Sequence, residues 1–172
     1  IKTFLGVEMQ RTPDGIHLLQ FHLIERILQA VNLSVTQDDK GRNLKDTPAV
    51  KPLLMRDTNG APRSLPWNYR SVIGMLNYLS GSTRPDTSFV VHQVARFCAE
   101  PKRSHEKAVM RIARYLQTSS RFGTFYKVDK NRGLEVYVDA DFAGSWSQEN
   151  ALDPNSVLSR TGCAMFLFGC PL

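Results

Sequence analysis

The sequence predicts an α+β fold, with a β-hairpin first, helices in the centre and strands at the end. Apolar residues alternate near the N-terminus, recur at helical spacing over residues 20–33 and 67–120, and alternate again after residue 133. The chain has 172 residues, of which 42% are hydrophobic and 22% charged, as in globular proteins. A chain of this length buries enough surface to fold without disulfides or a structural metal. We therefore expect compact structure rather than a disordered tail or a fibre.

A hairpin followed by a helix is predicted for residues 1–33. Apolar residues between Phe4 and Met9 meet a turn cluster at 13–15, Pro-Asp-Gly, after which apolar residues resume up to Leu19. From Gln20 to Leu33 the apolar period becomes that of a helix.

Residues 34–66 predict a long connection without regular structure. Few of its apolar residues are regularly spaced, and four of the nine prolines fall within it. It also contains a charged run from Asp38 to Asn43, which we expect to be mobile.

Three further helices are predicted between residues 67 and 120. The first starts at Trp67 and is ended by residues 81–85. The second follows Asp86, whose carboxylate is placed to cap it or to favour it electrostatically, and stops before Pro101. The third starts at Ser104, a good N-cap, with Glu106 in its first turn.

The third of these helices is predicted to carry a basic face. Its apolar residues between Ala108 and Leu116 share one side, while Lys107, Arg111 and Arg114 stand at i, i+4 and i+7 on the other. A helix with an apolar back and a cationic front suits the phosphate backbone of a nucleic acid. The alternative is a surface helix whose basic residues meet only water.

Positive charge is concentrated in the middle of the chain. The net charge is +6, but residues 51–133 carry 15 Lys and Arg against 5 Asp and Glu. Residues 1–50 balance at 6 and 6, and residues 134–172 carry 1 against 5. The basic middle suggests an anionic partner such as a polyphosphate backbone. A solvated helical surface rich in Arg and Lys is the alternative interpretation.

Two strands are predicted at the C-terminal end, beyond a domain boundary near residue 130. They cover residues 134–139 and 162–168, with an irregular insertion around Asp153 between them. Asp139 and Asp141 end the first strand, where carboxylates can hold Mg²⁺. Phosphodiester cleavage through two such ions needs three or four convergent carboxylates, so the pair by itself is a weak signal. The alternative is a pair of acids that end the strand for turn chemistry.

The cysteines and the apolar runs indicate an intracellular protein without a membrane partner. Cys98, Cys163 and Cys170 form an odd set without a Cys-x-x-Cys pair, so we expect reduced structural thiols rather than a zinc site. No apolar run approaches the roughly 18 residues that cross a bilayer. The first residues form neither a start methionine nor a signal peptide, which indicates a piece of a longer chain.

Seven motifs stand in an order that resembles copia-type retrotransposon polyproteins. Together they extend over nearly the whole chain, and their agreement in order makes the resemblance specific. The motifs are Phe4-Leu5-Gly6-Val7-Glu8, Asp46-Thr47-Pro48, Tyr69-Arg70-Ser71-Val72-Ile73-Gly74-Met75-Leu76-Asn77-Tyr78-Leu79, Thr83-Arg84-Pro85-Asp86, His105, Arg114-Tyr115-Leu116 and Tyr137-Val138-Asp139-Ala140-Asp141-Phe142-Ala143-Gly144.

The resemblance implies a reverse transcriptase that runs into the start of a ribonuclease H. Residues 1–33 would end the palm, 34–66 form a proline-rich connection, 67–130 a helical thumb and its continuation, and 131–172 the first strands of a truncated ribonuclease H-like α/β domain. The hairpin looks like a primer grip, which would place Leu5 and Gly6 near the primer's 3′ end, where a glycine lets the backbone approach nucleic acid. A simple strand kink is the alternative for Gly6.

The resemblance also implies which carboxylates would bind metal in the ribonuclease H. Asp139 would be the first metal-binding aspartate of the ribonuclease H, with Asp141 the weaker candidate. The sequence departs from the family's pattern at Phe142, where Trp is common, and at Cys163, where Tyr is usual. The chain contains no Tyr-x-Asp-Asp polymerase pair and ends before the family's next catalytic glutamate, so we expect neither active site to be assembled.

The leading hypothesis is a fragment of a retrotransposon reverse transcriptase and ribonuclease H that contributes to template–primer binding and is inert alone. Its expected partners are an RNA or DNA template–primer or hybrid and the remainder of the polyprotein, in a cytoplasmic particle or the nucleus. The first alternative is a non-catalytic, helical nucleic-acid-binding module from a domesticated or decayed element. The second is a decayed chain with no present role. We also expect self-association, or poor order, through the last 40 residues, because they end in an apolar strand.

Overall fold

The computed structural model describes residues 2–34, 45–49, 54–144, 146–148, 151–152 and 156–172. The chain forms two compact units. The first, here the helical unit, combines Ile1–Gln10 with Leu18–Thr124, and the second, the strand unit, combines Arg11–His17 with Phe125–Leu172. Helices and antiparallel sheets are both present, which confirms the α+β class.

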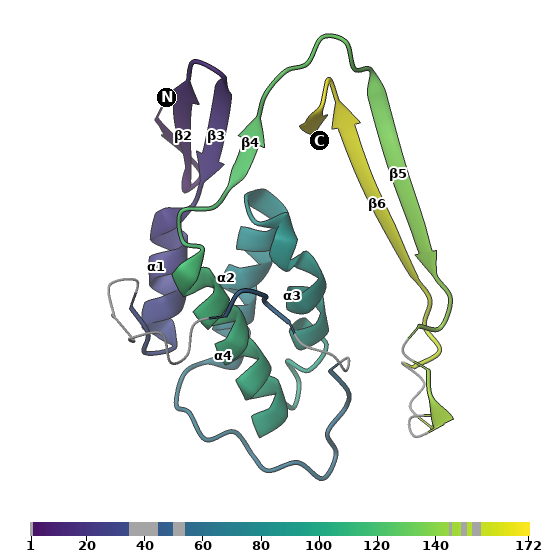
Figure 1. Ribbon diagram of the computed structural model, residues 1–172. Helices are drawn as coiled ribbons and strands as arrows, with labels where there is room; N and C mark the ends of the chain where they lie inside the picture. The colour runs from purple at the N-terminus through teal and green to yellow at the C-terminus, as the bar shows by residue number, and fades with distance from the viewer. Residues whose placement is uncertain (1, 35–44, 50–53, 145, 149–150, 153–155) are drawn as a thin grey trace. The chain divides into compact units, whose positions relative to one another are not determined.

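The N-terminal hairpin is confirmed and is part of a larger sheet. Its first arm was predicted from Phe4 to Met9, but Leu5 and Gly6 form a turn that divides it. The strands of this sheet are β1 (Thr3–Phe4), β2 (Val7–Thr12), β3 (Gly15–Leu19) and β4 (Thr124–Tyr126), in the order β1-β2-β3-β4 (Figure 1). Strand β4 was not predicted, because three residues are too short a run to show a period. Two glycines allow its close approach to β3, since a Cβ on Gly15 would overlap the Tyr126 carbonyl and one on Gly123 the Leu18 carbonyl.

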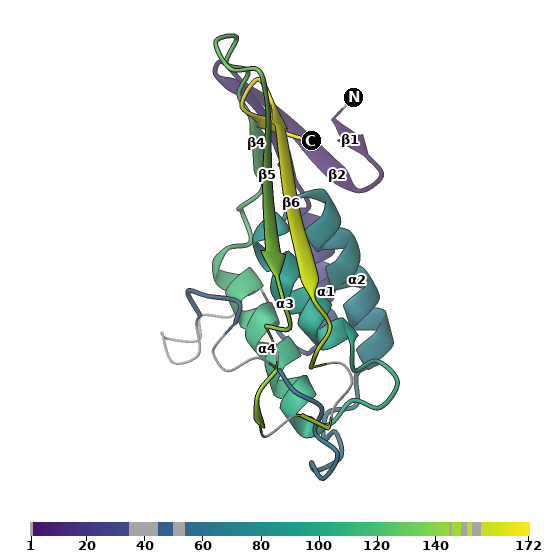
Figure 2. The ribbon, with the colours of Figure 1, turned by 90° about the vertical axis from the view of Figure 1, so that its right-hand side faces the viewer.

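The helices follow the predicted apolar periods. They are α1 (Phe21–Ala30), α2 (Tyr69–Ser82), the short 3₁₀ helix η1 (Pro85–Thr87), α3 (Ser88–Ala95) and α4 (Arg103–Thr118). Helix α2 packs on α1 and α3, and α4 also packs on α1 and α3, so that the four α-helices surround one core (Figures 1 and 2). That core includes Ile24, Ile27, Leu28, Val72, Leu76, Leu79, Val91, Val94, Val109, Ile112 and Leu116.

The start of α4 differs from the prediction that Ser104 is its N-cap. The helix begins at Arg103, and its N-cap is Lys102, two residues before Ser104. The backbone N–H of Lys102 donates to Nδ1 of His105 over 2.9 Å, while Oγ of Ser104 donates to the carboxylate of Asp57 over 2.6 Å. The prediction was wrong because the imidazole of His105, three residues further on, caps this end, whereas Ser104 binds the connection.

The first turn of α4 holds the connection in place. The carboxylate of Glu106, buried among its neighbours, accepts hydrogen bonds from the backbone N–H groups of Ser64 and Leu65 at 3.2 and 2.9 Å. Nε2 of His105 donates to the Met55 carbonyl over 3.0 Å. Residues 45–49 and 54–66, the described part of the connection, contain no helix or named strand, as predicted. The charged run expected to be mobile, Asp38 to Asn43, lies outside the described residues.

The two predicted C-terminal strands are confirmed in the strand unit. Strand β5 (Leu134–Asp141) pairs antiparallel with β6 (Arg160–Leu167), from Leu134 opposite Leu167 to Asp141 opposite Arg160. The short β7 (Cys170–Pro171) pairs with the end of β6. Side chains on both faces of β5 are exposed, including apolar ones such as Val138. The insertion around Asp153 lies largely outside the described residues.

Candidate functional site

The turn between β1 and β2 presents Leu5 and Gly6 at the tip of a tight hairpin. Phe4 pairs with Val7, so the loop has two residues, and both have positive φ, 49° for Leu5 and 76° for Gly6. Two positive φ angles are the signature of a type I′ turn, which matches the twist of the flanking strands. For a leucine this conformation costs about 1–2 kcal/mol, whereas glycine adopts it freely. The side chain of Leu5 is 72% exposed, and nothing lies within 4 Å of where a Cβ on Gly6 would be.

Tyr78 of α2 fixes the position of this tip. Its hydroxyl donates a hydrogen bond to the Leu5 carbonyl over 2.5 Å, although the ring is still 46% exposed. The bond ties a strained turn to a helix that is anchored in the core. The sequence places Tyr78 within a motif but does not predict this role. A helical period carries no information about a contact with a turn 73 residues earlier.

The predicted basic face of α4 is only partly open. Lys107 is exposed, whereas Arg111 and Arg114 are half-buried. Nη2 of Arg111 donates to Oγ1 of Thr47 over 2.9 Å, and Thr118 donates to the Lys45 carbonyl over 3.2 Å. This side of the helix therefore carries residues 45–47 of the connection. Among the three basic residues, Lys107 is the one that solvent reaches most freely.

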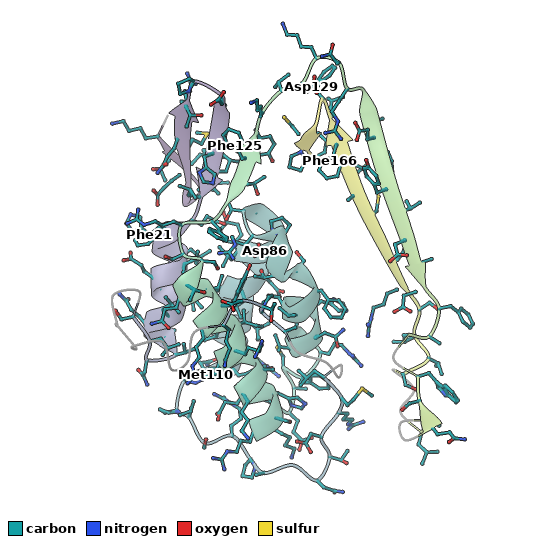
Figure 3. All side chains as sticks on the ribbon, viewed as in Figure 1. Phe21, Asp86, Met110, Phe125, Asp129 and Phe166 are labelled. Atoms are coloured by element: carbon teal, nitrogen blue, oxygen red, sulfur yellow. The ribbon has the colours of Figure 1, made fainter. Side chains whose placement is uncertain are left out.

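A buried polar network explains two of the sequence motifs. Arg84 is 1% exposed. Its Nε and Nη2 donate to the carboxylate of Asp86 at 3.0 and 2.8 Å (Figure 3). It also donates to the carbonyl and the hydroxyl of Ser119, each at 2.8 Å. The hydroxyl of Tyr115 donates to the same carboxylate over 2.6 Å. The network joins the end of α2 to the end of α4, so Arg84 has a structural role and is not placed to bind phosphate.

The network also sets the protonation of its members. Burial raises the pKa of the Asp86 carboxyl, but hydrogen bonds from Arg84 and Tyr115 outweigh that effect and hold it below its usual value. Burial, and then the bond to Asp86, raises the pKa of the Tyr115 phenol. Of the two roles predicted for Asp86, capping of α3 is wrong, because no side-chain cap bond is made to that helix and the carboxylate binds Arg84 and Tyr115. The electrostatic role stays a prediction.

Asp139 and Asp141 lie on one face of β5, close to its end. Both side chains are exposed, and residues two apart on a strand are roughly 7 Å apart. The carboxylate of Asp141 lies against the backbone of Gly144, where a Cβ would overlap it, so this residue also shapes the turn after β5. Proteins often bind one Mg²⁺ through only one or two carboxylates, with water and phosphate as the other ligands. Asp139 and Asp141 supply two.

A two-ion site needs more carboxylates than the structure brings together here. Glu135, on the same strand, is held by Arg132 over 2.6 Å, and this hydrogen bond lowers the pKa of its carboxyl. Glu149 and Asp153 lie outside the described residues. Within the described part of the chain, no three His, Cys, Asp or Glu side chains gather as metal ligands would. The residues that the structure describes therefore do not assemble a two-ion site.

Two further features are the cysteines and the lengths of the helices. Cys98, Cys163 and Cys170 are free thiols, as predicted. Among the helices that the structure describes, none combines the length and the apolar character needed to cross a bilayer.

Comparison with known proteins finds similarity over almost the entire chain. It is 31% identical over 169 residues to the retrovirus-related Pol polyprotein from transposon RE1 of Arabidopsis thaliana, a match that covers 98% of this chain and 10% of that protein. Identity to the corresponding polyprotein from transposon RE2 is 30% over 169 residues, covering 98% of this chain and 11% of that protein. An uncharacterized mitochondrial protein of the same plant is 28% identical over 170 residues, covering 97% of this chain and 62% of that protein.

This chain spans about a tenth of the length of the two Pol polyproteins. No family model matches it. No solved structure matches it either. Its homologues thus include retrovirus-related Pol polyproteins from plant transposons, which support its being a transposon-derived polyprotein region.

Proposed function

We propose that this chain is the part of a copia-type reverse transcriptase that holds the template–primer, continuing into the start of a ribonuclease H. The observation that carries the proposal is the open Leu5–Gly6 turn. Its two positive φ angles expose the backbone at the tip, and Gly6 presents no Cβ to an approaching strand. The motif around it resembles a primer grip, and two Pol polyproteins from plant transposons are among the homologues.

Basic residues of the helical unit supply the electrostatic part of the proposed binding. Lys107 is exposed on α4, and Arg114 follows on the same side of the helix. Arg111 contributes less, because one of its nitrogens already binds Thr47. Contacts of this kind position a nucleic acid without reading its sequence.

The carboxylates of β5 belong to the proposed nuclease. Asp139 is the proposed first ligand of Mg²⁺, with Asp141 beside it, and the ion would stabilise charge on a phosphodiester in the longer protein. The described residues offer too few carboxylates for two-ion hydrolysis, so we expect the 172-residue chain by itself to bind nucleic acid without cleaving or extending it.

Salt-dependent binding of an RNA–DNA hybrid tests the proposal. We expect the chain to bind a fluorescent hybrid, with an affinity that falls steeply with salt because phosphate contacts release counterions. The double variant Lys107→Glu with Arg114→Glu is expected to reduce the slope of log K against log salt by about 2, in line with two lost contacts. Lys130→Glu, an exposed basic residue of the strand unit, is the matched control.

The outcomes are distinct. No binding by the native chain at low salt would refute the proposal, and equal loss with the control variant would show that only total charge matters. A magnesium-dependent cleavage of the hybrid that disappears in Asp139→Ala would overturn the claim that the chain is inert alone.

One observation favours a second candidate, a non-catalytic nucleic-acid-binding module. The mitochondrial relative is a much shorter protein than the Pol polyproteins, since this chain covers 62% of it. A similar stretch thus also occurs outside a polyprotein. The genomic sequence on either side separates the two candidates: an upstream Tyr-x-Asp-Asp in the same open frame favours the polymerase, and interrupted flanks favour the separate module.

A further inference from the structure

A cavity of about 240 Å³ lies between α3 and α4 in the helical unit. Its walls are mostly apolar, with Val94 from α3 and Ile112 from α4, and Pro48 of the connection forms part of its edge. Proteins bind drug-sized ligands in sites of roughly 300–1,000 Å³. A cavity slightly below that range has room for one small planar group rather than a long ligand.

One residue that lines the cavity has a buried donor without an acceptor. Gln93 of α3 is 4% exposed, and its Nε2 has no hydrogen-bond partner among the described residues. The other end of the amide is occupied, because Oε1 accepts from Arg96 over 3.2 Å, which fixes which atom is left over. Buried polar groups are nearly always paired, so an unpaired N–H on a residue that lines an apolar cavity indicates a missing acceptor.

Two cations and an aromatic ring border the same cavity. Lys107 and Arg111 of α4 line it, and Nε of Arg111 has no partner within the described parts of the chain. Phe89 of α3 also lines it and remains 53% exposed. The set comprises a stacking surface, an N–H donor and positive charge, all at one small apolar cavity.

We infer that this cavity receives one unstacked nucleotide of a single-stranded template, with its base in the cavity and its phosphate outside. The base stacks on Phe89, an acceptor on the base edge takes the N–H of Gln93, and the phosphate lies near Lys107 and Arg111. Single strands are bound in this way elsewhere, by aromatic rings that stack bases and basic grooves that follow the backbone. The inference rests on the proposed function, because it assumes that the helical unit lies along the template.

Three labelled probes test the inference with the full 172-residue chain. They are a blunt RNA–DNA hybrid, the same hybrid with a short single-stranded template overhang, and that overhang with abasic sites in place of its bases. We expect the overhang probe to bind about tenfold more tightly than the other two, within the range measured for stacking a base on an aromatic side chain.

Two variants locate the effect. Gln93→Leu keeps the volume but removes the donor, and Phe89→Ala removes an exposed ring; each is expected to abolish the preference for the overhang while blunt-hybrid binding stays unchanged. Phe122→Ala, an exposed phenylalanine outside the cavity, is the matched control and should keep the preference. Circular dichroism of each variant verifies that the helices are retained.

Each result decides between the possibilities. Equal binding of all three probes by the native chain overturns the inference and leaves the proposed function standing. Equal binding of the intact and abasic overhangs, both tighter than blunt hybrid, shows phosphate contacts only and also overturns it. Failure to bind any probe refutes the proposed function and, with it, this inference.

Discussion

The helical unit and the β5–β6 ribbon place their side chains in opposite ways. In the helical unit Leu116 is fully buried, and even a charged residue, Arg84, is enclosed, with hydrogen bonds to Asp86 and to the buried Ser119. In the ribbon Val138 is 74% exposed. Four helices can surround a core, whereas a pair of strands with one short neighbour cannot cover both of its own faces. The helical unit therefore surrounds a core of its own, whereas the described ribbon leaves apolar side chains of both its faces exposed.

The largest expected effect breaks the buried network of the helical unit. Arg84→Met is expected to cost about 3–5 kcal/mol, because the buried carbonyl and hydroxyl of Ser119 each lose a hydrogen bond from a charged donor, at about 1.5–3 kcal/mol per bond. Urea unfolding followed by circular dichroism measures it. Arg103→Met, at an exposed position on α4, should change stability by less than about 0.5 kcal/mol. Equal losses of unfolding free energy in the two variants would mean that the Arg84 network does not stabilise the helical unit.

A matched pair of valines compares the two regions directly. Val109 of α4 is fully buried, so Val109→Ala is expected to lower the free energy of unfolding by about 2–3 kcal/mol through lost burial and the cavity left behind. Val138→Ala on the exposed ribbon should cost less than about 0.5 kcal/mol. The same urea titration measures both variants. A large loss in Val138→Ala would show that the ribbon is covered.

Acid should weaken the helical unit before it affects the ribbon. Burial lowers the pKa of His105, whose Nδ1 accepts a hydrogen bond from the Lys102 N–H and is therefore unprotonated. The unfolded chain takes up a proton near pH 6.5 and the folded chain does not, so stability present above that pH decreases as pH falls below it. Asp86, whose pKa is below its usual value, adds a second loss at lower pH.

Thermal unfolding at a series of pH values measures this dependence. His105→Gln is expected to flatten the profile near pH 6, and His92→Gln, an exposed histidine of α3, is the control that should not. An unchanged profile in His105→Gln would contradict the assignment.

The smallest expected effect concerns association of the ribbon. Exposed apolar strands with unpaired edges tend to pair with other chains. We expect Val138→Lys to reduce self-association in sedimentation velocity, whereas Val128→Lys, also exposed but outside the strands, should not. A native chain that is monomeric at high concentration would contradict the expected self-association.

The sequence predicted the elements with a clear period and missed the contacts between distant residues. The hairpin, the helices and the two long strands followed from apolar spacing, but β4 is too short to show one. The N-cap of α4 was wrong because the imidazole of His105 caps the backbone at Lys102 while Ser104 binds Asp57. Apolar spacing also placed Arg111 on the polar face of α4, but it could not show that the Arg111 guanidinium donates to Thr47.

For the candidate site, residue types were predictable and their surroundings were not. Leu5 and Gly6 were named from a motif, and the structure adds the positive φ angles and the bond from Tyr78. The pair Asp139 and Asp141 was named from its place at a strand end, which the register confirms. The cavity beside Gln93 depends on the packing of two helices, and no single period contains that information.

The central claim is that the Leu5–Gly6 turn lies at the end of the primer, and one measurement tests it most directly. A hybrid whose primer ends in a photoreactive 3′ nucleotide is crosslinked to the chain, and the attached peptide is identified by mass spectrometry. The account predicts that the label falls on residues 4–7, with a weaker signal in Tyr78→Phe, which loses the bond that positions the turn. Labelling confined to the β5–β6 ribbon, or spread evenly over the chain, would contradict it.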